Sequence, residues 1–401
     1  MARLLAFRRT RRNRNSWAPL SLALQRSGAL EEFRISFADA PGVAPRGAEV
    51  LAFSFVTMEL QDVAREVAAL RSAHRDRLLL IAGGPHASAD PQGTLALGFD
   101  VAFVGEGERS LAAFVRALAS GGGGPACIRD PGPPLDLDEQ WHVDPRLQLY
   151  PFAEISRGCP HACAFCQVPA MFGRRMRHRS PAVVGQGLEQ AVRAGFRRFR
   201  FLTPDAFAYR GGGGSPRQAL GQLLQEGRRA GANEMMLGTF PSEVRPDRVR
   251  EGLLQLVDER CTNRTLVIGA QSGSDRVLGL MHRGHTVEDS RRAVAATAAI
   301  GLKPHVDVLF GFPGETAEER LQTLAFAGWC VESARARIHA HVFMPLPGTP
   351  AWPKAPEKLE PGLIADLRRL QEAKVLDGDW VRQEMHGRRI LRWRDEGRIR
   401  V

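Results

Sequence analysis

The sequence lacks the apolar segments that would place a protein in or across a membrane. No uninterrupted apolar stretch approaches the ~18–20 residues that a membrane helix requires. The first apolar run, Leu4 to Phe7, is too short for a secretory signal and is better explained as a first strand. The chain has 401 residues, of which 44% are hydrophobic and 25% charged, as in soluble proteins of two domains. We therefore expect a cytoplasmic protein without a membrane partner.

Lysine is scarce, although the net charge is +11. It occurs only at Lys303, Lys354, Lys358 and Lys374, so nearly all the positive charge is arginine. A basic protein often has a polyanionic partner. Here the arginines are interspersed with acids, except at 8–14 and 174–179, and their excess alongside Ala and Gly is typical of a GC-rich genome. A nucleic-acid partner is therefore not expected.

A fourth cysteine is missing from the one segment that is rich in cysteine. Cys159, Cys163 and Cys166 have the spacing Cys-x3-Cys-x2-Cys, with no further cysteine close behind. An iron–sulfur cube normally takes four thiolates, so three would leave one iron open to a small molecule. Structural zinc needs four ligands, and His161 lies where a short loop cannot easily aim it inward. The spacing of the cysteines is also not typical of a set of disulfide pairs. The pattern thus predicts an open [4Fe-4S] cluster.

Alternating apolar runs and helical patterns predict an α/β fold with a parallel sheet in the first part of the chain. Continuous apolar strands, which indicate burial on both faces, are expected at 4–7, 50–55, 78–82 and 101–104. The last two are followed by Gly83-Gly84-Pro85-His86 and Gly105-Glu106-Gly107-Glu108. Ligands of open parallel sheets bind beyond the carboxyl ends of the strands, where both loops should lie.

The second part of the chain repeats the alternation. Strands are expected before Cys159 and at 199–202, 235–239, 266–269, 306–310 and 338–344, with helices between them. Six such units predict a partial (β/α)6 barrel of the TIM type, with its chemistry at the carboxyl-terminal face. The expected organisation is a Rossmann-like domain (1–120), a linker (121–148) that begins with a glycine run, the barrel (149–353) and a mostly helical extension (354–401).

The three cysteines, with Phe165 before the last, resemble the signature of the radical S-adenosylmethionine (SAM) enzymes. In that family the thiolates hold a [4Fe-4S] cluster, and the amino and carboxylate groups of SAM chelate the fourth iron. One-electron reduction then cleaves the sulfonium to a 5′-deoxyadenosyl radical. The resemblance implies an electron donor such as flavodoxin or ferredoxin.

Further motifs resemble one large branch of that family, which carries a cobalamin-binding domain. They are the two glycine loops and the segments 268–274, 281–286, 310–316 and 345–350. The resemblance implies cobalamin binding by Gly83, Gly84, His86, Gly105, Glu106 and Gly107. It implies SAM binding by Phe165, Asp205, Gln271, Ser272, Gly311 and Gly314. The motif Asp-x-His-x-x-Gly is absent, so cobalamin would bind without a histidine below the cobalt.

The resemblance implies functionalisation of an unactivated carbon in a small molecule, with cobalamin-dependent methyl transfer as the leading reaction. One alternative is a cobalamin-independent enzyme that modifies RNA or a peptide and has a vestigial first domain. The other is a non-catalytic iron–sulfur binding or sensing protein. Glu243, after the third barrel strand, is either a contact for a ribose hydroxyl or a solvated surface acid, and the second is expected. Cys330 is expected to be a core residue.

Overall fold

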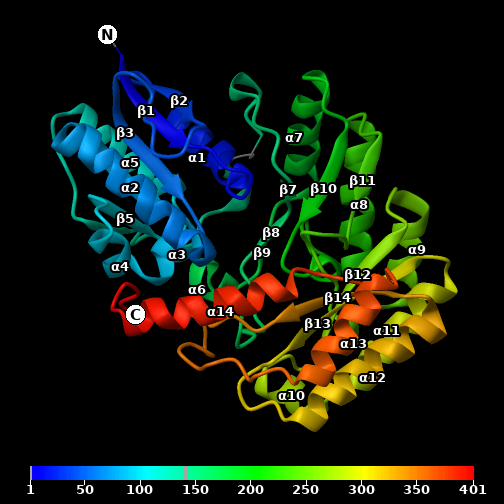
Figure 1. Cartoon of the computed structure of the whole chain (residues 1–401). Helices are drawn as coiled ribbons and strands as arrows, with labels where there is room; N and C mark the ends of the chain where they lie inside the picture. Colours follow the sequence, from blue (N-terminus) through cyan, green and yellow to red (C-terminus); the bar gives the residue numbers. More distant parts are fainter. Residues whose placement is uncertain (1, 140–142) are drawn as a thin grey trace.

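Six parallel strands form the amino-terminal sheet of the computed structural model, which describes residues 2–139 and 143–401. The order is β2-β1-β3-β4-β5-β6. This sheet lies in the blue and cyan part of the molecule (Figure 1). The strands are β1 (Arg3–Arg8), β2 (Phe33–Ala38), β3 (Ala48–Ser54), β4 (Leu79–Gly83), β5 (Val101–Val104) and β6 (Cys127–Arg129). The helices of this part are α1 (Arg14–Arg26), α2 (Leu60–His74), α3 (Gly84–Ala89), α4 (Pro91–Ala96) and α5 (Glu108–Ala119).

Helices cover both faces of this sheet, which explains its apolar strands. Leu80 of β4 packs in one core with Val67 of α2, whereas Ile81 packs in the other core with Trp17 of α1 and Phe114 of α5. Successive side chains of a strand point to opposite faces, so β4 has to be apolar throughout. The sheet therefore needs no polar face.

The sequence did not predict the two outer strands, β2 and β6. Each is hydrogen-bonded to one neighbour only and is partly exposed, so neither shows a continuous apolar run. β6 lies inside 121–148, the segment expected to be a linker. The domain boundaries stay predictions.

The second part of the chain forms an open arc of parallel strands. One sheet has the order β11-β10-β7 and another β12-β13-β14-β15, and a bridge between Val244 and Ile268 joins them. The strands are β7 (Ala153–Glu154), β10 (Arg198–Leu202), β11 (Glu234–Met236), β12 (Thr265–Gln271), β13 (Lys303–Phe310), β14 (Arg337–Val342) and β15 (Leu376–Asp377). Without β15, this is the expected set of six barrel strands.

The barrel helices lie outside this arc (Figure 1). They are α7 (Pro181–Arg193), α8 (Pro216–Arg229), α9 (Glu251–Arg260), α10 (Asp275–Leu280), α11 (Val287–Ala299), α12 (Ala317–Ala334) and α13 (Pro361–Glu372). α7 begins where the sequence predicts, because the Ser180 hydroxyl accepts a hydrogen bond from the Val183 N–H and Pro181 occupies the first turn. Cys330 is buried in this core, as expected.

The carboxyl-terminal helix α14 (Trp380–Asp395) connects the two parts of the molecule. Its Trp380 belongs to the barrel core, whereas Ile390 and Trp393 belong to the core of the first sheet. Figure 1 shows this helix crossing from the barrel strands to the amino-terminal part. The tail is mostly helical, as predicted, but also adds β15 to the barrel sheet. In the described ranges, no helix combines the length and apolarity needed to cross a membrane.

Candidate functional site

The three cysteines lie in one loop between β8 (Ser156–Arg157) and α6 (Val168–Phe172). β8 pairs with β9 (Arg177–His178), which closes the loop at its base. Gly158 has a positive φ of 84°, and a Cβ there would overlap the carbonyl oxygen of Arg175, so only glycine fits. Cys163 is buried, while Cys159 and Cys166 are half-buried. Burial raises the pKa of the Cys166 thiol to about 12.

The donor set of the loop fits a [4Fe-4S] cluster better than a structural zinc ion. A structural zinc site needs four ligands, and the loop supplies three thiolates. An iron–sulfur cube takes one thiolate per iron, so three thiolates leave one iron open to a small molecule.

A buried guanidinium contacts the cysteine loop. Arg283 donates from Nη1 to the Cys163 Sγ at 3.4 Å and from Nη2 to the Gly269 carbonyl at 2.6 Å. The loop reaches the same segment through the Ala164 N–H, which donates to the Met281 carbonyl. A cation here offsets the charge of the thiolates, since opposite charges within a few ångströms stabilise each other. Sequence reasoning missed Arg283, although it lies in the motif 281–286.

Two of the residues predicted to bind SAM join this group. Gln271 donates from Nε2 to Glu243 at 3.3 Å, and Glu243 lies 3.6 Å from Arg283. The expectation that Glu243 is solvated is therefore wrong, because the two side chains hold it at the barrel mouth. Phe165 packs with Leu309 and the other residues of the small core under the loop.

Asp205 also lies beside the cysteine loop. Its carboxylate is fully buried and pairs with Arg248 at 2.8 Å. Burial raises the pKa of Asp205 to about 6, against the influence of Arg248 and Arg245. Its charge acts on Cys159, whose pKa it helps to raise. The acid that the sequence singled out therefore acts electrostatically on the cysteine loop, while Arg248 pairs with its carboxylate.

The other three predicted SAM-binding residues make hydrogen bonds to other residues of the protein. The Ser272 hydroxyl lies 3.2 Å from that of Thr323 on α12 and is buried. Gly311 donates its N–H to Glu315 at 2.6 Å, and Gly314 donates to Glu357 at 2.8 Å. These contacts fix the turns after β12 and β13, and their role toward SAM stays a prediction.

Glu315 gives this turn a pH dependence. Burial raises its pKa from 4.5 to about 7, so the folded protein holds a proton that the unfolded chain loses above about pH 4.5. The free energy of unfolding therefore falls as the pH rises from about 4.5 to 7. We expect the Glu315→Gln variant to lack this pH-dependent loss of stability. Its free energy of unfolding should therefore rise relative to that of the wild type between about pH 5 and 8. Thermal unfolding midpoints measure this. Glu318→Gln, an exposed control on α12, should leave the pH profile unchanged, and an unchanged profile for Glu315→Gln would contradict the argument.

A cavity of about 450 Å³ separates the amino-terminal sheet from the cysteine loop. On the sheet side it is lined by Gly83, Gly84, Gly105, Glu106 and Gly107, all predicted to bind cobalamin. On the opposite side it is lined by Gln167, Val168, Met171 and Phe172, which directly follow Cys166. It therefore opens at the carboxyl ends of β4 and β5, where ligands of such sheets bind. A group bound here would touch the cluster-bearing segment.

The glycines of this cavity have conformations that other residues avoid. Gly84 and Gly105 have φ values of 88° and 83°. A Cβ on Gly84 would lie 2.7 Å from the Ser54 hydroxyl, whereas one on Gly105 would approach only the Met171 carbonyl, at 3.5 Å. The Gly105 backbone thus borders open space.

His86 does not line this cavity, contrary to the expectation for a cobalamin-binding residue. It is the third residue of α3, fully buried, with Nδ1 3.1 Å from the Thr57 hydroxyl and the ring against Phe55. Burial lowers the pKa of His86 to about 4, so the ring is neutral. The helix turns this side chain into the sheet core.

Glu106 is held by a buried ion-pair network between the two parts of the molecule. Arg157, just before the cysteine loop, lies 2.7 Å from Glu106 and 2.9 Å from Glu108. Arg157 also pairs with Glu154 at 2.7 Å, and Arg177 pairs with Glu106 at 3.0 Å. Glu106 thus ties the sheet to the loop. Breaking one member of such a network leaves a buried charge unpaired, which is costly.

Two protein families match different parts of the chain. Residues 153–327 match the Radical SAM superfamily, and residues 42–115 match the B12 binding domain. The first range contains all three loop cysteines, and the second contains Gly83 and Gly84 at the end of β4. The chain therefore contains a radical SAM domain. This confirms the resemblance and the α/β fold class expected from the sequence, with a B12 binding domain ahead of the radical SAM domain.

Relatives of this radical SAM protein include an uncharacterized protein of Methanopyrus kandleri, 29% identical over 251 residues, or 59% of this chain and 46% of that protein. A tRNA-2-methylthio-N(6)-dimethylallyladenosine synthase of Prosthecochloris aestuarii is 35% identical over 179 residues, covering 43% and 39% of the two chains. This chain therefore spans less than half the length of these two curated relatives.

The fold is also that of a solved structure. The radical S-adenosylmethionine methyltransferase TsrM from Kitasatospora setae, with cobalamin and a [4Fe-4S] cluster bound, has a TM-score of 0.65 and 18% identity. The match covers 88% of this chain and 77% of that of TsrM. The two domains of this radical SAM protein take a [4Fe-4S] cluster with SAM, and cobalamin, as cofactors. Its three thiolates and its glycine-lined cavity fit these groups.

Proposed function

We propose that this protein transfers a methyl group to an unactivated carbon of a small molecule, using the cluster, SAM and cobalamin together. The observation that carries the proposal is the shared cavity. Residues of the glycine loops line one side of it, and Gln167, Val168, Met171 and Phe172, directly after Cys166, line the other. When bound, the cluster with SAM supplies a radical, and cobalamin supplies a methyl carrier. The proposal requires the cluster with SAM and the cobalamin to bind next to each other.

The residues of the chain have three tasks in this proposal. Cys159, Cys163 and Cys166 hold the cluster, and Arg283 offsets their charge at 3.4 Å from Cys163. Arg157 fixes the loop against the sheet through Glu106 and Glu108. The apolar wall of the cavity excludes water, which would otherwise quench reactive species.

The experiment uses anaerobically reconstituted protein with SAM and a reductant, with and without cobalamin. S-adenosylhomocysteine marks the loss of the methyl group from SAM, and 5′-deoxyadenosine marks reductive cleavage. We expect both products with cobalamin and only 5′-deoxyadenosine without it. If cobalamin makes no difference to either product, the alternative of a vestigial first domain replaces the proposal. If neither product forms, the alternative of a binding or sensing protein replaces the proposal.

A second function, RNA modification, is suggested by the tRNA-modifying relative. The basic segment 174–179 would be its natural phosphate contact. In the structure, Arg177 pairs with Glu106, and Arg179 is buried and donates to the Glu154 carbonyl at 2.9 Å. Arg174 and Arg175 are exposed. Much of the segment's charge is thus directed into the protein, which favours a small-molecule substrate.

We therefore predict weak RNA binding that physiological salt abolishes. A protein that contacts roughly six to ten phosphates loses about 10³–10⁵ in affinity between about 50 and 200 mM salt. Fluorescence anisotropy with a labelled RNA should show no binding at the upper end of this range. Tight binding there, lost in the double variant Arg174→Ala and Arg175→Ala, would move the substrate class to RNA.

A further inference from the structure

A group of histidine and aspartate side chains, residue types that can ligate metals, lies on the inner face of the barrel. It consists of His305 and Asp307 on β13, His339 and His341 on β14, and Asp377 on β15. The residues that alternate with them along β13 and β14, such as Val306 and Ala340, are buried in the core beneath the outer helices. Because successive strand residues face opposite sides, the five side chains point inward. The mechanism proposed above uses none of them.

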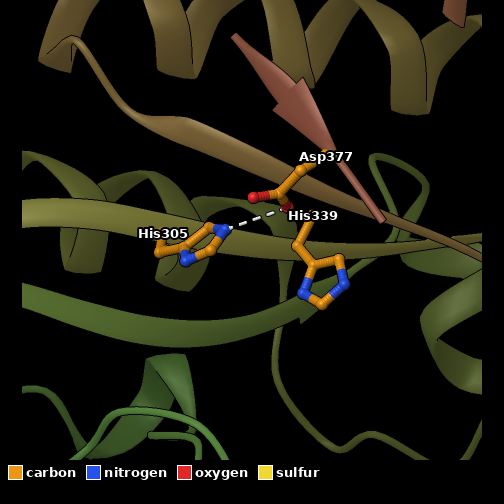
Figure 2. A group of neighbouring side chains, drawn as sticks. All are labelled: His305, His339 and Asp377. Atoms are coloured by element: carbon orange, nitrogen blue, oxygen red, sulfur yellow. Dashed lines mark hydrogen bonds and ion pairs between the residues drawn. The ribbon is translucent and has the colours of Figure 1, made fainter. Parts of the chain in front are cut away.

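Strand register brings these side chains together. Asp307 is paired with His339, and His339 with Asp377, across three adjacent parallel strands. His305 Nε2 lies 3.3 Å from Asp377 Oδ1 (Figure 2). One ligating atom from each of His305, His339 and Asp377 lies within 4.8 Å of the other two. All three side chains remain partly accessible, at 23%, 28% and 34% exposure, so an ion could reach them.

The donor set is that of a borderline divalent cation. Zinc binds imidazole nitrogen and carboxylate oxygen at about 2.0–2.2 Å, so two such atoms on one ion are at most about 4.4 Å apart. The observed grouping needs only small side-chain rotations to meet this limit. The negative charge of the group also suits a divalent cation. Among the described ion-pair partners of Asp307 and Asp377 there is one guanidinium, that of Arg337, which lies 2.7 Å from Asp377.

Two neighbours hold the donors in place. Arg337 contacts Oδ2 of Asp377, which leaves Oδ1 toward His305. Asp307 lies 3.4 Å from Nδ1 of His339. A carboxylate behind a metal-binding histidine fixes the ring orientation and its tautomer, and is the usual support of such ligands.

We propose that His305, His339 and Asp377 bind a divalent cation of the zinc type, with Asp307 orienting His339. Asp377 belongs to the short strand β15, which the tail adds to the barrel, so the ion fastens the tail to the barrel strands. The site lies toward the amino-terminal ends of β13 and β14, whereas the cysteine loop is at the carboxyl-terminal face. Zinc binding is therefore independent of the proposed methyl transfer.

The experiment measures zinc content and affinity in the cluster-loaded protein, in which iron occupies the three loop thiolates. Wild-type protein incubated with Zn²⁺ and desalted should retain one zinc per chain and show a higher thermal midpoint. His305→Gln and Asp377→Asn should lose the zinc and the shift, with iron content unchanged as the check on folding. Asp307→Asn should weaken zinc affinity about 10–100-fold.

His341→Gln is the matched control, because His341 forms the competing group with Asp307 and His339. Glutamine can keep the hydrogen bond to Gln383 that His341 makes at 3.1 Å. We expect this variant to bind zinc as the wild type does. The proposal is overturned if the iron-loaded wild type retains no zinc. It is equally overturned if His341→Gln loses zinc while His305→Gln keeps it.

Discussion

Replacing Cys159, Cys163 or Cys166 with alanine is expected to reduce SAM cleavage to background and to remove most of the iron. Each thiolate would hold one iron of the cluster, and the same loop has no spare cysteine to replace it. Cys163 is in addition the thiol that Arg283 contacts. Iron content and 5′-deoxyadenosine formation by reconstituted variants measure the effect.

The chain contains its own controls for this experiment. Cys127 is exposed on β6, and Cys261 and Cys330 are buried in the barrel core. Alanine at these three positions should leave iron content and SAM cleavage at wild-type levels. Four irons retained in Cys163→Ala would contradict the assignment of the cluster ligands.

Gly105→Leu is expected to abolish cobalamin retention while the cluster stays intact. The Cβ would meet only the Met171 carbonyl, at 3.5 Å, so the leucine side chain can enter the cavity between the sheet and α6. The backbone cost is modest, since a left-handed conformation at φ 83° costs a non-glycine residue about 1–2 kcal/mol. Cobalamin absorbance after desalting and iron content measure the two outcomes separately.

Gly47→Leu is the matched control for this variant. Gly47 has a similar φ of 80° and lies in the same part of the molecule, but a Cβ there would meet nothing within 4 Å. It is exposed and distant from the cavity lining. The positive φ should therefore destabilise the control variant by about as much as it destabilises Gly105→Leu, but the control should still retain cobalamin. Equal cobalamin retention by Gly105→Leu and the wild type would show that this cavity is not the binding site.

Most of the fold could be predicted because its strands are buried on both faces. β5 has the predicted bounds, 101–104, since a continuous apolar run is stable in a strand whose two faces are both buried. β2, β6 and β15 could not be predicted in this way. They are outer strands with one hydrogen-bonded neighbour, so burial imposes no clear pattern on their sequences.

The site was predictable only where the chemistry is local in the sequence. The cysteine spacing predicted the cluster, whose proposed ligands lie within eight consecutive residues. Arg283 and Arg157 were missed because their partners Cys163 and Glu106 are 120 and 51 positions away along the chain. His86 was misplaced for a different reason. The sequence does not show how a side chain in the first turn of α3 is directed, and packing against Phe55 turns it inward.

The cofactor content of anaerobically reconstituted wild-type protein tests the central claim most directly. The claim is that one molecule holds cobalamin and the cluster on opposite sides of the cavity between the glycine loops and α6. Protein given iron, sulfide and excess cobalamin, then desalted, should contain four irons and one cobalamin per chain. Four irons with no cobalamin would contradict the account.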